Sequence, residues 1–180
     1  MLKRGFLVLM LATGLAACDD DTPTSPADPN LAVFTAQLSA LNEVGGNTPP
    51  ATQTETTARG DVRIEFRLTR DSGNSLTGAT VAFIVNLTGF PPEGSIWRAA
   101  HIHEGVSGVA GSVRVDTGLT PETAIPLVNG GITGHRFENR PVTDLRVLNE
   151  ILNNPSGWYF NAHTVRNTAG AVRGQLVRIQ

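Results

Sequence analysis

Cysteine and lysine are almost absent from this 180-residue chain. The only cysteine is Cys18, so no disulfide can form within the chain, and the fold must be stabilised by its apolar core. The only lysine is Lys3 and the arginines are scattered singly, so there is no basic stripe of the kind that binds nucleic acid. P-loop and nucleophile-elbow motifs are also missing. We therefore expect neither a nucleic-acid partner nor one of the common nucleotide or hydrolase sites.

A long apolar run is lacking as well. The apolar stretch at residues 5–17 is too short to span a bilayer comfortably. It follows a basic start and ends in small residues directly before Cys18, which resembles a bacterial lipoprotein signal. That resemblance implies removal of residues 1–17, lipid on Cys18, and attachment to a membrane of the bacterial cell envelope, facing the periplasm or the exterior. An ordinary secretory signal followed by a stray cysteine is the alternative.

Residues 18–30 contain three prolines and three consecutive aspartates, with almost nothing apolar. Such a segment cannot bury enough surface to fold, so we expect a disordered tether there. The folded domain is expected over residues 31–180. Without residues 1–17 the chain carries 12 arginines and 16 acidic residues, a formal charge of −4.

Apolar and polar residues alternate along most of this domain, as in strands with one buried and one wet face. Residues 60–69 alternate most regularly, and residues 76–88 are expected to form a hairpin with them. Further strands are expected at residues 34–40, 96–103, 112–115, 132–137, 157–165 and 171–179. Residues 141–154 have helical spacing instead, with Thr143 expected as the N-cap. The pattern predicts an all-β fold with one short helix, an antiparallel β-sandwich or barrel with Greek-key connections.

The segment at residues 100–111, AHIHEGVSGVAG, carries two of the four histidines of the chain. If it ends a strand, His101 and His103 leave the same face because side chains alternate. The same alternation places Trp97 on the histidine face and Arg98 on the opposite one. Two neighbouring imidazoles can share a metal ion, or they can simply pack as polar groups at an end of the sandwich.

Four segments occur in the order typical of one known family. They are residues 41–44 (LNEV), 100–111 with their glycines, 158–164 (WYFNAHT) and 170–176 (GAVRGQL). The chain resembles the CHRD domain, first named in chordin and also found in secreted microbial proteins. It departs from the family pattern in the insertion of residues 45–48 before Pro49 and in Val172, where an acidic residue is usual. The resemblance implies an immunoglobulin-like β fold, export and no established reaction, so we expect a lipid-anchored, non-catalytic module that binds an unidentified partner.

The pattern His-x-His-Glu before a glycine-containing loop is also similar to the copper-ligand strand of copper–zinc superoxide dismutases. This likeness implies His101, His103 and His163 as ligands of copper or zinc, with Arg173 steering an anion to an open coordination position. Dismutase-like activity is the least expected outcome, because the disulfide, the zinc loop and the bridging histidine of those enzymes have no counterpart here. The fourth histidine, His135, matches no motif and is expected at the surface.

A structural role for the same region is the alternative. Tyr159 and Asn161 share a strand face with His163, and together with Glu104 and Arg173 they are candidates for a hydrogen-bonded network. Such a network would fix the fold without any metal by satisfying buried donors and acceptors.

Overall fold

The computed structural model describes residues 28–44 and 55–180. The expected signal peptide, Cys18 and most of the expected tether lie outside these residues. Within them, no helix is long and apolar enough to cross a membrane.

Ten strands and one α-helix make up the part of the chain that the structure describes. The strands are β1 (Leu31–Ser39), β2 (Arg59–Arg70), β3 (Leu76–Thr88), β4 (Ile96–Glu104), β5 (Val113–Asp116), β6 (Ile125–Pro126), β7 (Ile132–Pro141), β8 (Trp158–Thr164), β9 (Val172–Gln175) and β10 (Val177–Arg178). The helix is α1 (Leu145–Asn153), and short 3-10 turns include η1 (Ala40–Asn42) and η3 (Pro121–Thr123). The predicted antiparallel all-β fold with one short helix is confirmed.

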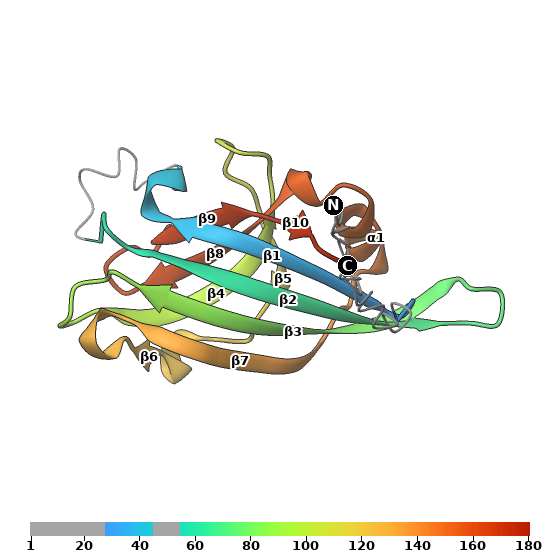
Figure 1. Ribbon diagram of the computed structural model, residues 1–180, viewed down its shortest axis with the longest axis horizontal. Coiled ribbons are helices and arrows are strands. Elements are labelled where there is room, and N and C mark those ends of the chain that lie inside the picture. The colour runs from blue at the N-terminus through green and yellow to red at the C-terminus, as the bar shows by residue number, and fades with distance from the viewer. Residues whose placement is uncertain (1–27, 45–54) are drawn as a thin grey trace, which may run out of the picture.

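All strand pairs are antiparallel and belong to one sheet in the order β5-β4-β8-β9-β1-β2-β3-β7, with β6 beside β4 and β10 beside β1. Strands distant in sequence are neighbours at β4–β8, β9–β1, β10–β1 and β3–β7, as Greek-key connections require. The sheet curls so that β1, β2 and β3 face β4 and β8 across the core, giving a nearly closed barrel (Figure 1).

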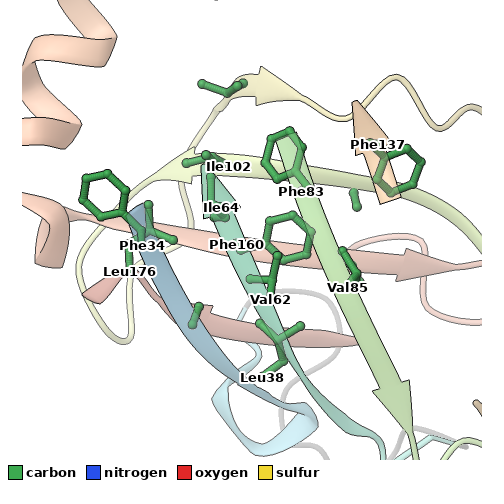
Figure 2. Close-up of a cluster of buried hydrophobic side chains, with 14 of the residues drawn as sticks. Phe34, Leu38, Val62, Ile64, Phe83, Val85, Ile102, Phe137, Phe160 and Leu176 are labelled. Atoms are coloured by element: carbon green, nitrogen blue, oxygen red, sulfur yellow. The ribbon is translucent and has the colours of Figure 1, made fainter. Parts of the chain in front are cut away.

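The β2–β3 hairpin shows why the sequence folds this way. The alternating residues of β2, Val62, Ile64 and Phe66, are fully buried, and Ile64 pairs with Phe83 of β3. Across the barrel the Phe83 ring meets Phe160 of β8, with ring centroids 5.9 Å apart (Figure 2). One apolar face of each strand therefore fills a common core, and the predicted hairpin is confirmed.

The helix begins one residue later than its sequence predicts. Asp144, not Thr143, is the N-cap, because its carboxylate accepts hydrogen bonds from the backbone N–H groups of Arg146 and Val147. Leu148 and Ile151 then face the core.

A β-bulge in β4 changes which residues face outward. Trp97 pairs with Thr164 and Ala99 pairs with His163, so two residues of β4, Arg98 and Ala99, lie opposite one residue of β8. Trp97 consequently points into the core, where it is fully buried. The prediction that Trp97 shares the histidine face was wrong, because strict alternation fails at an inserted residue.

Strand β8 is buried along its whole length. Its alternate residues Trp158, Phe160 and Ala162 belong to the apolar core. The others, Tyr159, Asn161 and His163, lie on the outer side of the barrel, where loops cover them. The histidine region therefore lies on the outer face of the sheet and not at an end of a sandwich.

Candidate metal centre

The pairing of β4 with β8 brings three histidines together. In this register Ala99 lies opposite His163 and His103 opposite Tyr159, which places His163 diagonally beside His101. The ring centroids of His101 and His163 are 5.1 Å apart, and those of His103 lie 5.5 and 5.8 Å from them. One ring nitrogen from each histidine lies within 4.8 Å of the other two. The trio expected from the sequence thus forms one cluster.

Two backbone carbonyls fix the tautomers of His103 and His163. His103 Nδ1 lies 3.0 Å from the Gly111 carbonyl oxygen, and His163 Nδ1 lies 3.1 Å from that of Thr168. A carbonyl oxygen can only accept, so both Nδ1 atoms carry the proton and each Nε2 atom is an unprotonated acceptor. This arrangement, in which a second group holds the outer nitrogen, is the one that orients metal-binding histidines.

The third imidazole is held on both sides. His101 Nδ1 is 3.3 Å from His163 Nε2, and its Nε2 is 3.8 Å from the Asp116 carboxylate. By contrast, His103 Nε2 is buried and has no hydrogen-bond partner among the described residues. The lone pair of His163 Nε2 is therefore satisfied by His101, whereas nothing in the described part of the chain satisfies that of His103 Nε2.

These separations are close to those of a metal site. In a tetrahedral site with metal–nitrogen bonds of about 2.0–2.1 Å, neighbouring nitrogens are about 3.4 Å apart. The His101–His163 separation of 3.3 Å already matches. The widest nitrogen–nitrogen separation in the trio, at most 4.8 Å, would have to shorten by about 1.4 Å or less.

All three imidazoles are neutral near pH 7. The pKa of His103 and that of His163 are lowered to about 4, chiefly by burial and partly by the neighbouring imidazoles, against the raising effect of their carbonyl partners. Burial also lowers the pKa of His101, although Asp116 opposes that shift. Neutral imidazole is the form that binds a metal ion, so the cluster is ready to do so without releasing protons.

A stack of planar groups supports His103. The Tyr159 ring lies parallel to the imidazole at 4.9 Å, and the Arg173 guanidinium lies 3.4 Å from the centre of the tyrosine ring. The Gly111 N–H donates to the Tyr159 hydroxyl at 3.1 Å. A Cβ at Gly111 would lie 1.4 Å from the Glu104 carbonyl oxygen, so only glycine allows this loop to close over the stack.

Arg173 itself is 2% exposed and donates to the Val106 carbonyl at 2.8 Å. Its described contacts are all within the fold. It therefore supports the stack, and the expectation that it steers an anion from solvent has no geometric support.

No pattern in the sequence predicted a role for Glu43 at this site, although Glu43 belongs to the segment at residues 41–44 that matches the family. Glu43 and Asn161 are almost fully buried, and Asn161 Nδ2 donates weakly to Glu43 Oε2 at 3.5 Å. Burial raises the pKa of Glu43 to about 8, although Arg173 and Asn161 pull it down. Glu43 Oε1 and Asn161 Oδ1 have no hydrogen-bond partner in the described part of the chain.

A second buried acid, Glu55, fixes the turn beside the cluster. It is fully buried and accepts hydrogen bonds from Ser95, Thr164 and Asn167 at 3.0, 2.6 and 2.6 Å. The Asn167 turn also provides the Thr168 carbonyl that holds His163. No sequence signal marks Glu55, because it lies in a polar segment.

Two residues lie elsewhere than their sequence context predicts. Glu104 pairs with Arg114 at 2.7 Å at the protein surface, and its described contacts do not join it to Tyr159 or the histidines. His135 is half-buried, because its ring packs on Trp97 and Phe137 with centroids 5.5 and 4.7 Å away. The prediction of a surface position for His135 was therefore wrong.

A surface hollow of about 580 Å³ opens beside the cluster. His101 and His163 line it together with Arg98, Asp116, Leu119 and Thr120. His103 is not part of its lining. A metal ion held by the three imidazoles would therefore have one side turned towards this hollow.

Comparison with protein-family models gives a match to the CHRD domain over residues 34–176. No curated protein and no solved structure matches the chain. The match includes all three clustered histidines and most of the chain. The chain therefore belongs to the CHRD domain family.

Proposed function

We propose that this CHRD-domain protein binds one transition-metal ion, copper or zinc, through His101, His103 and His163. The observation that carries the proposal is the convergence of three neutral imidazoles around the buried His103 Nε2, whose lone pair no residue in the described part of the chain satisfies. Imidazole nitrogen suits both copper and zinc, and three such ligands leave one coordination position open.

A purely structural network explains the same residues less well. The hydrogen bond between His101 and His163 needs no metal. Among residues 28–44 and 55–180, however, it leaves the buried His103 Nε2 without a partner, and an unsatisfied buried acceptor costs about 1–3 kcal/mol. A cation bound to His103 Nε2 removes this desolvation cost. It uses the Nε2 lone pairs of His103 and His163, whose Nδ1 atoms are held by the two carbonyls.

We assign no reaction to the site, and the proposed role is binding without turnover. Dismutase-like activity is the least favoured alternative. Attachment to a membrane of the bacterial cell envelope through lipid on Cys18 is part of the same proposal, and it rests on the signal-like N-terminal sequence.

Binding of an unidentified partner protein is the second candidate. It is favoured by Val106, Val109 and Val113, which are about half exposed in and beside the loop that covers Tyr159. Exposed apolar side chains gathered in one loop are typical of interaction sites. Metal binding and partner binding use different atoms, so they do not exclude each other.

Metal retention by the full-length protein tests the main proposal. The protein, made without a histidine tag and purified in detergent, is exposed to copper or zinc, passed through gel filtration and subjected to elemental analysis. We expect about one equivalent of metal, because three preorganised imidazoles retain either ion. Less than about a tenth of an equivalent would contradict the proposal.

Two variants make this test specific. His103→Gln should lose the metal, whereas His135→Gln, which alters a half-buried histidine outside the cluster, should retain it. If His103→Gln does not fold, the copper EPR spectrum of the unaltered protein replaces it, since ligation by imidazoles must give nitrogen hyperfine splitting. In metal-free buffer His101→Ala should cost about 1–3 kcal/mol of stability, because it leaves the buried His163 Nε2 without its donor, and a much larger loss would favour the structural network.

A further inference from the structure

The β4 bulge moves a positive charge to the histidine side of the sheet. Strict alternation places Arg98 opposite His101 and His103, but the inserted residue returns it to their face. Arg98 accordingly lines the same hollow as His101 and His163. Bulges commonly redirect a side chain next to a functional site, and this bulge redirects an arginine.

The guanidinium of Arg98 has no hydrogen-bond or ion-pair partner among residues 28–44 and 55–180. Its charge nevertheless reaches the cluster, since it contributes to the lowered pKa of His163. Two acids lie nearby: Asp116, 3.8 Å from His101 Nε2 with 58% of its side chain exposed, and the exposed Glu122 of η3, whose pKa Arg98 helps to lower. A divalent cation at the histidines together with Arg98 would therefore leave the hollow with excess positive charge, which an added anion would balance.

The hollow is larger than a simple inorganic anion. Its volume of about 580 Å³ lies within the range of small-molecule sites, about 300–1,000 Å³. Part of its wall is apolar, formed by Ala99, Val113, Leu119 and Pro121. An occupant with an anionic group and an apolar body would match both the charge and the wall.

We propose that the hollow binds a small organic carboxylate, whose carboxylate group lies between Arg98 and the metal held by the histidines. The assignment rests on the proposed metal site, because the metal provides the second positive partner. Arginine provides two parallel N–H donors that match a carboxylate, and the apolar wall receives the remainder of the ligand.

Benzoate is a suitable probe, and the copper-loaded full-length protein in detergent is the sample. Binding is measured by isothermal titration and by the change in the copper EPR spectrum. We expect benzoate to bind and to alter the spectrum, and benzamide, its neutral analogue, to do neither. Formate, which lacks the apolar body, should bind at least about tenfold more weakly, since burying a few carbons contributes more than 1.4 kcal/mol.

Two arginine variants identify the partner. Arg98→Gln should weaken benzoate binding by about tenfold or more, because it removes charge-assisted hydrogen bonds, and should leave copper stoichiometry unchanged. Arg63→Gln, which removes a charge from β2 where Arg63 pairs with Glu65, should leave benzoate affinity unaltered.

The outcomes separate the two proposals. Copper retained with equal affinities for benzoate and benzamide, or with unchanged benzoate affinity in Arg98→Gln, would overturn the carboxylate assignment alone. Equal affinities for formate and benzoate would overturn the organic ligand. Failure of the unaltered protein to retain metal would overturn both this inference and the proposed function.

Discussion

Replacing Glu43 by glutamine tests the charge state of the buried acid next to the histidine region. Glutamine has nearly the same shape as a protonated glutamic acid and cannot ionise. The pKa of Glu43 is raised from 4.5 to about 8, chiefly by burial. The unfolded chain therefore releases this proton at much lower pH than the folded protein does. The contribution of Glu43 to stability is complete below about pH 4.5 and is lost as the pH rises to about 8.

The size of this loss follows from the shift. One pKa unit corresponds to about 1.4 kcal/mol, so full ionisation of Glu43 in the folded protein costs at most about 5 kcal/mol. Between pH 6 and pH 9 the unaltered protein should lose up to about 3 kcal/mol more than Glu43→Gln. The histidines are present in both proteins, so their titration cancels in this difference.

Urea denaturation of metal-free protein at pH 6, 7, 8 and 9, followed by the fluorescence of Trp97 and Trp158, measures the effect. Glu43→Gln should match the unaltered protein most closely at the lowest pH and become the more stable of the two as the pH rises. The control is Glu104→Gln, which removes a surface carboxylate paired with Arg114. It should change stability by less than about 1 kcal/mol at every pH.

An ionised Glu43 would give a different dependence of stability on pH. If Glu43 is ionised and paired with the buried Arg173, Glu43→Gln leaves that guanidinium without its counter-charge. The variant would then be destabilised by a similar amount at every pH, and the unaltered protein would show no decline between pH 6 and pH 9. That pattern would refute the assignment of a neutral Glu43.

Two further predictions concern the metal and the membrane. The pKa values of His103 and His163 are about 4, so protons should displace the metal only below about pH 5. Equilibrium dialysis at a series of pH values measures this release. Release of the metal near pH 6.5 would contradict the prediction. Cys18→Ser should leave the precursor unlipidated and uncleaved at that site, as immunoblotting and lipid labelling can show, and unchanged processing would contradict the lipoprotein prediction.

The sequence pattern predicted local structure well where a single periodicity, either strand alternation or helical spacing, runs through a segment. Alternation over residues 60–88 gave the β2–β3 hairpin, with β3 at the expected bounds, because each of these strands has one fully buried face. The helix was also expected, and its first residue was misplaced by one because Asp144 competes with Thr143 for the cap.

The candidate site was harder to predict. The likeness to known ligand strands grouped His101, His103 and His163, but it could not give their separations. Alternation also placed Trp97 and Arg98 on the wrong faces, because one inserted residue reverses the pattern and leaves no mark in the sequence. The roles of Glu43 and Glu55 were missed because burial of an acid depends on what covers it.

The sequence by itself determined most of the strands, the helix and the family of this protein, since these follow from short-range periodicity and from an ordered set of motifs; it missed β6 and merged β9 with β10. Only the tertiary structure decided that β4 lies beside β8, that the sheet curls into a nearly closed barrel, and that Arg98 turns towards the histidines. The physical reason is that these features depend on pairing between segments about 60 residues apart in the chain, where register and bulges are set by the packing of the whole core.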